Sequence, residues 1–304
     1  MLGKLNQWLE PTVGRFFLWA IAPIFAARIF IFPLSLPLVA YLIFTNNYTS
    51  TDVQLFFAFF ILTTLGLSLG FHRQASHKSF QPHPAIRFLF LALGSMAFQA
   101  PVTYWVTTHL KHHAFSDRNQ DPHSPVEKGF WHGHYGWTMS YDREQANDQY
   151  KRFIERDQML MFFQHSYLLW LVLAAEICFL VGSWSGVLWG FVLATLVSDH
   201  LTRFINSWGH MHGSTPFKTN DNSRNNWWLA LITYGDGWHN NHHAFPRSAF
   251  HGLRWYEIDI SGYIIRSLEA IGLATKVVHI SPEDIDKKLV KNTYSETIPE
   301  NSEA

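Results

Sequence analysis

Residues 52–77 read DVQLFFAFFILTTLGLSLGFHRQASH, an apolar run that leads directly into a pair of histidines. About 20 apolar residues let a helix cross a lipid bilayer, and residues 52–71 supply that length with Asp52 as their only charge. His72 and His77 follow immediately, five positions apart. The stretch therefore predicts a transmembrane helix with metal-binding side chains just outside the membrane.

Three further apolar runs of similar length occur in the chain, and short uncharged connections at 45–51 and 182–186 join the runs into two hairpins. The four predicted spans are, to about one turn, 30–45, 52–71, 166–182 and 187–205. The composition agrees, because only 15% of the residues are charged, against about 25% in soluble proteins. The alternative is a pair of buried hairpins in a soluble helical protein, favoured by a mean hydropathy of −0.03. Such a core would need more charged covering helix than this chain has, so we expect an all-α integral membrane protein.

The distribution of positive charge predicts the orientation. Lys and Arg number ten within 72–165 and nine from residue 206 onward, and the two short connections have none. Because Lys-rich and Arg-rich loops stay in the cytoplasm, both termini and a helical cap made of 72–165 and 206–280 are expected there. The apolar segment 85–105 is interpreted as an interfacial or re-entrant helix, since a further span would divide the histidines between the two sides of the membrane.

Other features of the charge pattern limit the classes of function. The net charge is zero, with 23 basic and 23 acidic residues, so no basic field for nucleic acid exists. The polar tail, 281–304, is predicted to lack stable structure. We therefore treat residues 1–304 as a single membrane-bound domain whose function lies in its cap.

The chain has eighteen histidines but only one cysteine, Cys178, which excludes a disulfide framework, a Cys-based zinc site and an iron–sulfur cluster. Eight histidines fall in three clusters, and those at offsets of three and four residues share one helical face. The clusters are His72 and His77; His109, His112 and His113; and His239, His242 and His243.

Two more polar residues share a helical face after the fourth span, namely Asn206 and His210. One zinc ion takes about four ligands, so the clusters imply two metals. Imidazole suits iron, copper, nickel and zinc alike, which leaves the metal open. His72 and His77 point about 140° apart on an ideal helix, so either the helix ends between them or they face different metals.

These histidine boxes, with SMAFQAPVTYW (95–105) before the second and GDGWHNNHHAFP (235–246) around the third, resemble a known family. The family is that of the integral-membrane fatty acyl desaturases, and the likeness over residues 50–260 is to the delta-9, stearoyl-CoA desaturase-like class in its bacterial and cyanobacterial branch. The resemblance implies a non-haem di-iron centre, with Asn206 holding a water on one iron. The implied iron ligands are His72, His77, His109, His112, His113, His210, His239, His242 and His243.

The resemblance also implies the reaction. A cis double bond would be placed at delta-9 of a saturated acyl chain, with O2 as co-substrate and two electrons from an external donor, ferredoxin or cytochrome b5. The acyl chain would be carried by coenzyme A, acyl carrier protein or a membrane glycerolipid. A membrane hydroxylase or epoxidase with the same boxes is the alternative function. A metal transporter would place ligands inside its spans, and soluble carboxylate-bridged di-iron enzymes need Glu-x-x-His, which does not occur in this sequence.

A substrate tunnel is expected beside the second span. The side chains 4, 7, 8 and 11 positions before His72 share its face on an ideal helix, and Trp105 and Trp238 are further candidates. The four helix positions are Ser68, Leu65, Thr64 and Ile61. Six residues are candidates for orienting or supporting the metal ligands: Asp117, Asp121, Asp199, Asp236, His123 and His251.

Overall fold

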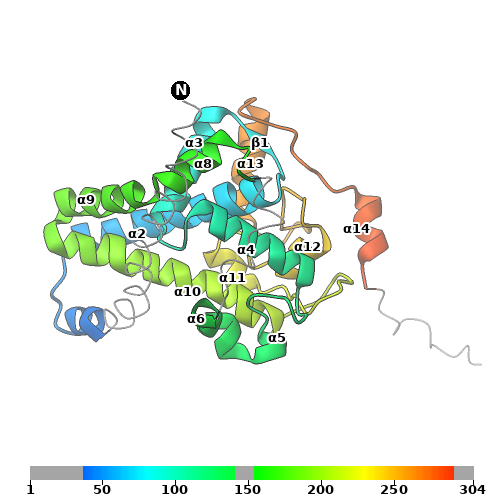
Figure 1. The fold of residues 1–304 in the computed structure, drawn as a ribbon, viewed down its shortest axis with the longest axis horizontal. Helices are drawn as coiled ribbons and strands as arrows, with labels where there is room; N and C mark the ends of the chain where they lie inside the picture. Colours follow the sequence, from blue (N-terminus) through cyan, green and yellow to red (C-terminus); the bar gives the residue numbers. More distant parts are fainter. Residues whose placement is uncertain (1–36, 141–153, 291–304) are drawn as a thin grey trace, which may run out of the picture.

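The computed structural model describes residues 37–140 and 154–290, and this part of the chain is mostly helical (Figure 1). One apolar helix of 27 residues runs from Ser50 to Ser76, as α2 (Ser50–Leu65) and the π-helical turns of η1 (Gly66–Ser76). Its start is capped reciprocally, because Thr49 accepts the amide hydrogen of Asp52 and the Asp52 carboxylate accepts that of Thr49. The helix is long enough to cross a bilayer and still carry histidines beyond it.

The second long apolar segment, Tyr167–His210, is divided by a reversal. α9 (Tyr167–Gly186) is interrupted at Ser183, where φ is 54° and ψ is −149°, outside the helical region. The chain then continues through the π-helical η3 (Val187–Leu193) and α10 (Ala194–Ser207). Figure 1 shows α9 and the start of this returning arm running side by side.

The close approach of Gly190 to Cys178 demonstrates the reversal. A β-carbon on Gly190 would lie 2.8 Å from the Cys178 Sγ, whereas residues twelve positions apart on a straight helix are separated by about 18 Å. The predicted runs 166–182 and 187–205 thus form the two arms of a hairpin. Glycine is needed at the crossing because no other side chain fits between the arms.

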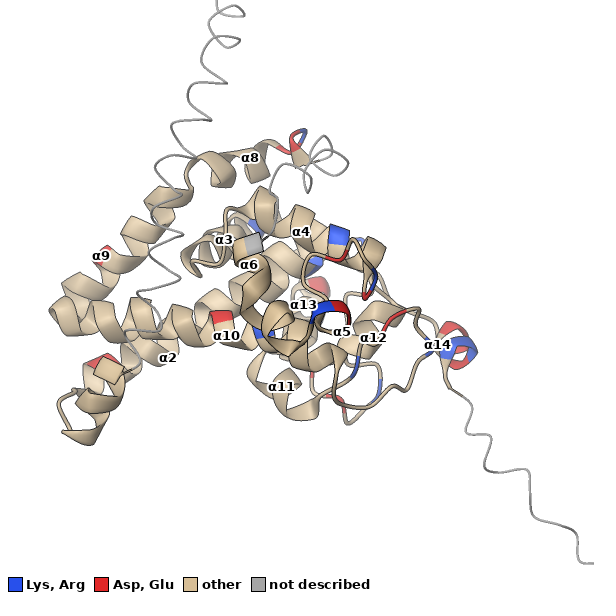
Figure 2. Cartoon of the chain, turned by 60° about the horizontal axis from the view of Figure 1, so that its bottom comes forward, with Lys and Arg blue, Asp and Glu red and all other residues tan. Residues whose placement is uncertain are grey.

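Two helical segments in the described residues, Ser50–Ser76 and Tyr167–His210, are long and apolar enough to span a membrane, and the second is divided at Ser183. Of the first predicted span, 30–45, residues 30–36 lie outside the described residues, and 37–44 are helical. Figure 2 shows that Lys, Arg, Asp and Glu are sparse along α2, α9 and α10 and gather instead in the loops and helices at the opposite end of the molecule. This separation gives the protein an apolar end and a polar end.

The segment 85–105 does not form one helix, which corrects our expectation. It is divided into α3 (Pro84–Met96) and α4 (Val102–Phe115), with Pro101 at the N-cap of the second helix. α3 packs tightly on η1, since a β-carbon on Gly70 would lie 2.7 Å from the Phe90 carbonyl oxygen. The break lets α4 take a new direction and carry the second histidine box across the end of η1.

The other elements are short and make up the polar end. They are α5 (Pro125–Lys128), η2 (His132–Gly136), α6 (Trp137–Ser140), α8 (Gln158–His165), η4 (Trp208–His210), α11 (Trp227–Ile232), α12 (His239–Ala244) and α13 (Ile260–Ala270), with a small antiparallel ribbon of β1 (Gln81–Pro82) and β2 (Ala274–Thr275). An apolar cluster that includes Phe71, Leu91, Val106 and Phe163 joins η1, α3, α4 and α8. It holds two of the histidine-bearing helices together.

The beginning of the tail is ordered, contrary to the expectation for 281–304. Ser281 caps α14 (Pro282–Lys288), and Leu289 then forms an antiparallel bridge with Phe217. Acidic residues in the first turn and lysines in the last turn suit the helix dipole, and Leu289 packs in an apolar cluster with Phe217. Residues 291–304 lie outside the described residues.

Candidate metal centre

The π-helical end of the first long helix brings His72 and His77 together. The amide of His77 donates to the carbonyl of His72 at 3.2 Å, an i to i−5 hydrogen bond that is typical of π-helical turns. This wider turn takes more residues per revolution, so side chains five positions apart come onto neighbouring directions. Their ring centroids are 5.1 Å apart. Both histidines therefore face one metal group, and their expected 140° separation does not apply.

The second box separates its three histidines along α4. His109 and His113, one turn apart, have ring centroids 4.6 Å apart and lie beside His77. His112 points to a different set of rings, and its centroid lies 5.0 Å from that of His210. The His-x-x-His-His spacing thus supplies two donors to one group and one to another.

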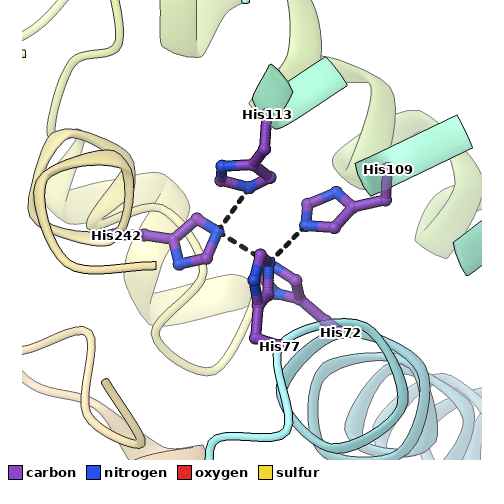
Figure 3. A group of neighbouring side chains, drawn as sticks. All are labelled: His72, His77, His109, His113 and His242. Carbon is purple, nitrogen blue, oxygen red and sulfur yellow. Dashed lines mark hydrogen bonds between the residues drawn. The ribbon is translucent and has the colours of Figure 1, made fainter. Parts of the chain in front are cut away.

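The third box, on α12, divides in the opposite sense. His242 joins the first group, while His239 and His243 join the second, together with His210 of η4. Within each group one ligand atom per residue lies within 4.8 Å of every other. The first group, shown in Figure 3, is His72, His77, His109, His113 and His242; the second is His112, His210, His239 and His243. The nine histidines named from sequence all lie in these two groups.

The ring nitrogens converge as a metal requires. In the first group the Nε2 atoms of His77 and His109 are 2.7 Å apart, and those of His242 and His113 are 2.9 Å apart. Figure 3 shows these rings pointing inward from three different helices. In the second group the Nε2 atoms of His112 and His243 are buried and have no hydrogen-bond partner within the described residues. Buried imidazole nitrogens left this way fit a bound cation, because an unpaired buried polar atom otherwise costs about 1–3 kcal/mol.

Burial favours the neutral imidazole that binds metal. Desolvation lowers the pKa of five of the nine rings well below the usual histidine value, and neighbouring histidines reinforce the shift. These five are His77, His109, His113, His239 and His242. Burial also lowers the pKa of His243, to about 4, although Asp221 opposes the change. For His112, burial is outweighed by the Asp121 carboxylate, and its pKa is raised.

Three carboxylates, whose side chains are at most 11% exposed, orient histidines of the second group by accepting their Nδ1 hydrogens, which leaves each Nε2 facing the group. The pairs are Asp121 with His112 (3.0 Å), Asp117 with His210 (2.9 Å) and Asp221 with His243 (2.7 Å). Burial alone would raise the pKa of each carboxyl, but the histidine partners outweigh it and hold the pKa below its ordinary value. In the first group Asp236 lies 3.4 Å from the Nδ1 of His72.

One of these carboxylates was missed in the sequence, and one expected carboxylate has a different partner. Asp221 lies in a loop 22 residues before His243, and no local spacing links the two. Asp199, which we expected to orient a ligand, instead accepts a hydrogen bond from the Arg203 Nε at 2.6 Å. Asn206 is half-buried on α10, four residues before His210.

Two further buried histidines lie against the groups without joining them. The ring centroid of His123 is 4.3 Å from that of His112, and the ring centroid of His251 is 4.5 Å from that of His242. Burial lowers the pKa of His123 to about 3 and that of His251 to about 4. Both rings are therefore neutral where they pack beside the two groups, and each also lies close to a carboxylate, His123 to Asp121 and His251 to Asp236.

The four helix positions expected to line a tunnel occupy different environments. Thr64 is buried with its hydroxyl 3.0 Å from that of Ser198, and the buried Ser68 hydroxyl donates to Asp236 at 2.9 Å. Leu65 packs in the cluster beneath α13, and Ile61 is 41% exposed. Because π-helical turns begin at Gly66, residues before it lose the helical register with His72 that an ideal helix would give.

Both candidate tunnel tryptophans lie next to metal-group histidines. The Trp105 ring stacks on that of His109, with centroids 5.2 Å apart, and its indole donates to the Gln99 side chain at 3.2 Å. Trp238 directly precedes His239 and donates its indole hydrogen to the Ile258 carbonyl at 2.8 Å. Each indole is thus held in place by a hydrogen bond.

Comparison with known proteins assigns this arrangement to a family. The sequence model of the fatty acid desaturases matches residues 53–264, which contain both groups of histidines. The chain belongs to the fatty acid desaturase family. An sn-1 stearoyl-lipid 9-desaturase from Synechocystis sp. is 40% identical over 252 residues, covering 82% of this chain and 79% of that protein.

Relatives with different carriers are similarly close. Delta-9 acyl-lipid desaturase 1 of Arabidopsis thaliana is 38% identical over 234 residues, covering 76% of each chain. An acyl-CoA C20 Delta5-desaturase of Anemone leveillei is 39% identical over 240 residues, covering 75% of this chain and 73% of that protein. The percentage identity of these relatives to this chain therefore does not separate lipid-linked from CoA-linked substrates.

The convergence of ring nitrogens predicts a loss of metal when one donor is removed. His242→Ala takes a ligand from the first group, and the purified protein should then hold about one metal ion per chain fewer, because the remaining donors bind more weakly. Metal content by mass spectrometry measures this. The matched control is His279→Ala, which removes an exposed histidine paired with Glu269 at 3.1 Å and should keep the full complement. Equal metal content in both variants would contradict the assignment.

Proposed function

We propose that this chain is a membrane-bound fatty acyl desaturase that places a cis double bond at delta-9 of a saturated acyl chain. The observation that carries the proposal is the pair of adjacent histidine groups, five and four residues, in a chain of the fatty acid desaturase family. The stearoyl-lipid 9-desaturase of Synechocystis sp. and the delta-9 acyl-lipid desaturase of Arabidopsis thaliana support the position of the bond.

Two iron ions are proposed as the resident metals, one in each group. The first group would supply five imidazoles, and the second would supply four and a water held by Asn206, which lies one turn before His210. Iron supplies the activation of O2 that no amino-acid side chain can perform on an unactivated methylene. Imidazole donors by themselves suit several metals, so iron is proposed from the family's reaction rather than from the donor set.

The stoichiometry of the reaction defines which molecules the protein must admit to the site. A saturated acyl chain, O2, two electrons and two protons give the unsaturated chain and two molecules of water. The chain loses two hydrogen atoms from adjacent carbons, and the external donor supplies the other two electrons. Burial of the histidine groups keeps bulk water from the reacting carbons, and the surrounding apolar cluster would hold the methylenes in place.

The alternative is a hydroxylase or epoxidase with the same histidine boxes, which would insert oxygen instead of removing hydrogen. The named relatives favour desaturation, since each is a desaturase. The acyl carrier is proposed to be a membrane glycerolipid or coenzyme A, because relatives of both kinds match this chain. Ferredoxin or cytochrome b5 is proposed as the electron donor.

Product analysis tests the activity. Expressed in a host that lacks its own desaturase, the protein should convert saturated C16 and C18 chains to cis delta-9 products, located by derivatisation of the double bond and mass spectrometry. His113→Ala, which removes a first-group donor, should yield no product, and His279→Ala should yield as much as the unchanged protein. Hydroxylated or epoxidised chains as main products would favour the alternative.

We further propose four spans with the histidine groups and both termini in the cytoplasm, supported by the basic residues of the cap and by the uncharged connections. A reporter fused at Asn47, in the turn before α2, should then be external, and one at the C-terminus should be cytoplasmic. Glycosylation and protease-protection assays at the two positions measure this. The reverse pattern would reject the orientation. If both reporters lay on the same side of the membrane, the number of spans between Asn47 and the C-terminus would differ from the three proposed.

The acyl chain is proposed to run beside the second span, against the buried side of α2. Thr64 faces Ser198 of α10 there, while Ile61 lies on the exposed side of the same helix. Thr64→Trp should shorten the space available and shift preference from C18 toward C14 and C16 chains, with the double bond at an unchanged distance from the head group. Phe57→Trp, the matched control at a position of the same helix that is 54% exposed, should leave the ratio unchanged. Competition among mixed C14–C18 chains gives the measurement, and equal ratios in both variants would exclude this path.

A further inference from the structure

The two histidine groups differ in the charge that surrounds them. In the second group three ring nitrogens donate to buried carboxylates, Asp117, Asp121 and Asp221. The side chains of these carboxylates are 3%, 0% and 11% exposed. Within the described residues none of the three is paired with lysine or arginine, and their other hydrogen-bond donors are neutral backbone amides and hydroxyl groups. The four imidazoles of the second group therefore have three negatively charged carboxylates next to them.

The first group has much less negative charge behind five imidazoles. Its only neighbouring carboxylate among the described residues is Asp236, 3.4 Å from the Nδ1 of His72. Asp236 is shared with the fully buried Arg73, whose guanidinium lies 3.3 Å away and also pairs with Asp259 at 2.8 Å. Arg73 with these two carboxylates adds up to a single negative charge. The second group thus exceeds the first by two negative charges.

This difference acts on any metal that the groups hold. A carboxylate that accepts the Nδ1 hydrogen of a ligating histidine makes the opposite nitrogen more basic and stabilises positive charge on the metal. In a buried environment such interactions are screened less than in water. More negative charge around one metal favours its more highly charged oxidation state, so two otherwise similar ions would differ in potential.

We infer that the two metal positions are electronically unequal, and that Asp117, Asp121 and Asp221 are positioning residues that make the four-histidine iron the harder of the two to reduce. This inference rests on the proposed di-iron function. Each iron passes from Fe(III) to Fe(II) by taking one electron from the external donor that the reaction already requires. The first electron therefore reduces the five-histidine iron, and the second reduces the four-histidine iron.

Asp221→Asn tests the inference, because asparagine keeps the size and an acceptor oxygen but removes the charge behind His243. Protein loaded with two ⁵⁷Fe ions is poised at a series of potentials, and Mössbauer spectra report the Fe(II) fraction of each iron. We expect two separate midpoints in the unchanged protein. The variant should raise only the lower of the two midpoint potentials. It should also weaken the binding of the iron with that potential about 10–100-fold in competition with a chelator.

Two other variants make the result specific. Asp117→Asn acts through His210 from a different loop, and it should shift the midpoint potential of the same iron as Asp221→Asn. Asp284→Asn removes a carboxylate of α14 that pairs with Lys287 at 2.9 Å, and it should leave the midpoint potentials of both irons unchanged. A purely structural role would disturb both irons or reduce the folded yield, whereas a charge effect changes one midpoint in an otherwise intact protein.

The outcomes separate this inference from the function on which it rests. If the chain holds two irons that share one midpoint, or if Asp221→Asn moves both midpoints or neither, the inference is overturned and the di-iron function stands. If the unchanged protein binds fewer than two irons under iron-replete anaerobic loading, the di-iron function itself is overturned. If an asparagine variant loses one iron to the chelator while the other keeps its spectrum, the inference is supported without a measured potential.

Discussion

Nine imidazoles, six from buried and three from half-buried histidines, face one another through their ring nitrogens, and this is the constraint on which the structure depends. Four ring pairs have Nε2 atoms only 2.7–3.0 Å apart, and the Nε2 atoms of His112 and His243 have no protein partner within the described residues. So many polar atoms cannot be buried cheaply unless a cation satisfies them. Metal binding would therefore stabilise the fold of the polar end, as in other proteins whose ligands come from distant segments.

The apolar end holds those segments in position. The hairpin reversal at Ser183 returns the chain alongside α9 toward the histidines, and close packing of α3 on η1 keeps the first box fixed relative to the second. The π-helical turns of η1 bring His72 and His77 into one group. An ordinary α-helix would direct the two rings to different sides.

Outer partners then distinguish the two groups. The carboxylates beside the second group come from the loop between α4 and α5 and the loop before α11. Within the described residues the first group has only Asp236, which shares Arg73 with Asp259, so that the three side chains together carry one negative charge. A reaction that draws electrons singly from a donor benefits from metals that accept them in a defined order. The protein can provide that order with charges placed beyond the ligands, without changing the ligands themselves.

The sequence by itself determined the features that arise from local periodicity. Apolar runs of sufficient length identify Ser50–Ser76 and the two arms of the later hairpin, and the spacing in the histidine boxes identifies the residues that converge. Only the tertiary structure decided that the nine histidines divide into five and four, that 85–105 breaks into two helices and that Asp221 supports His243. These outcomes depend on where distant segments meet, and on packing such as that of Gly70 against Phe90, which no single segment of sequence encodes.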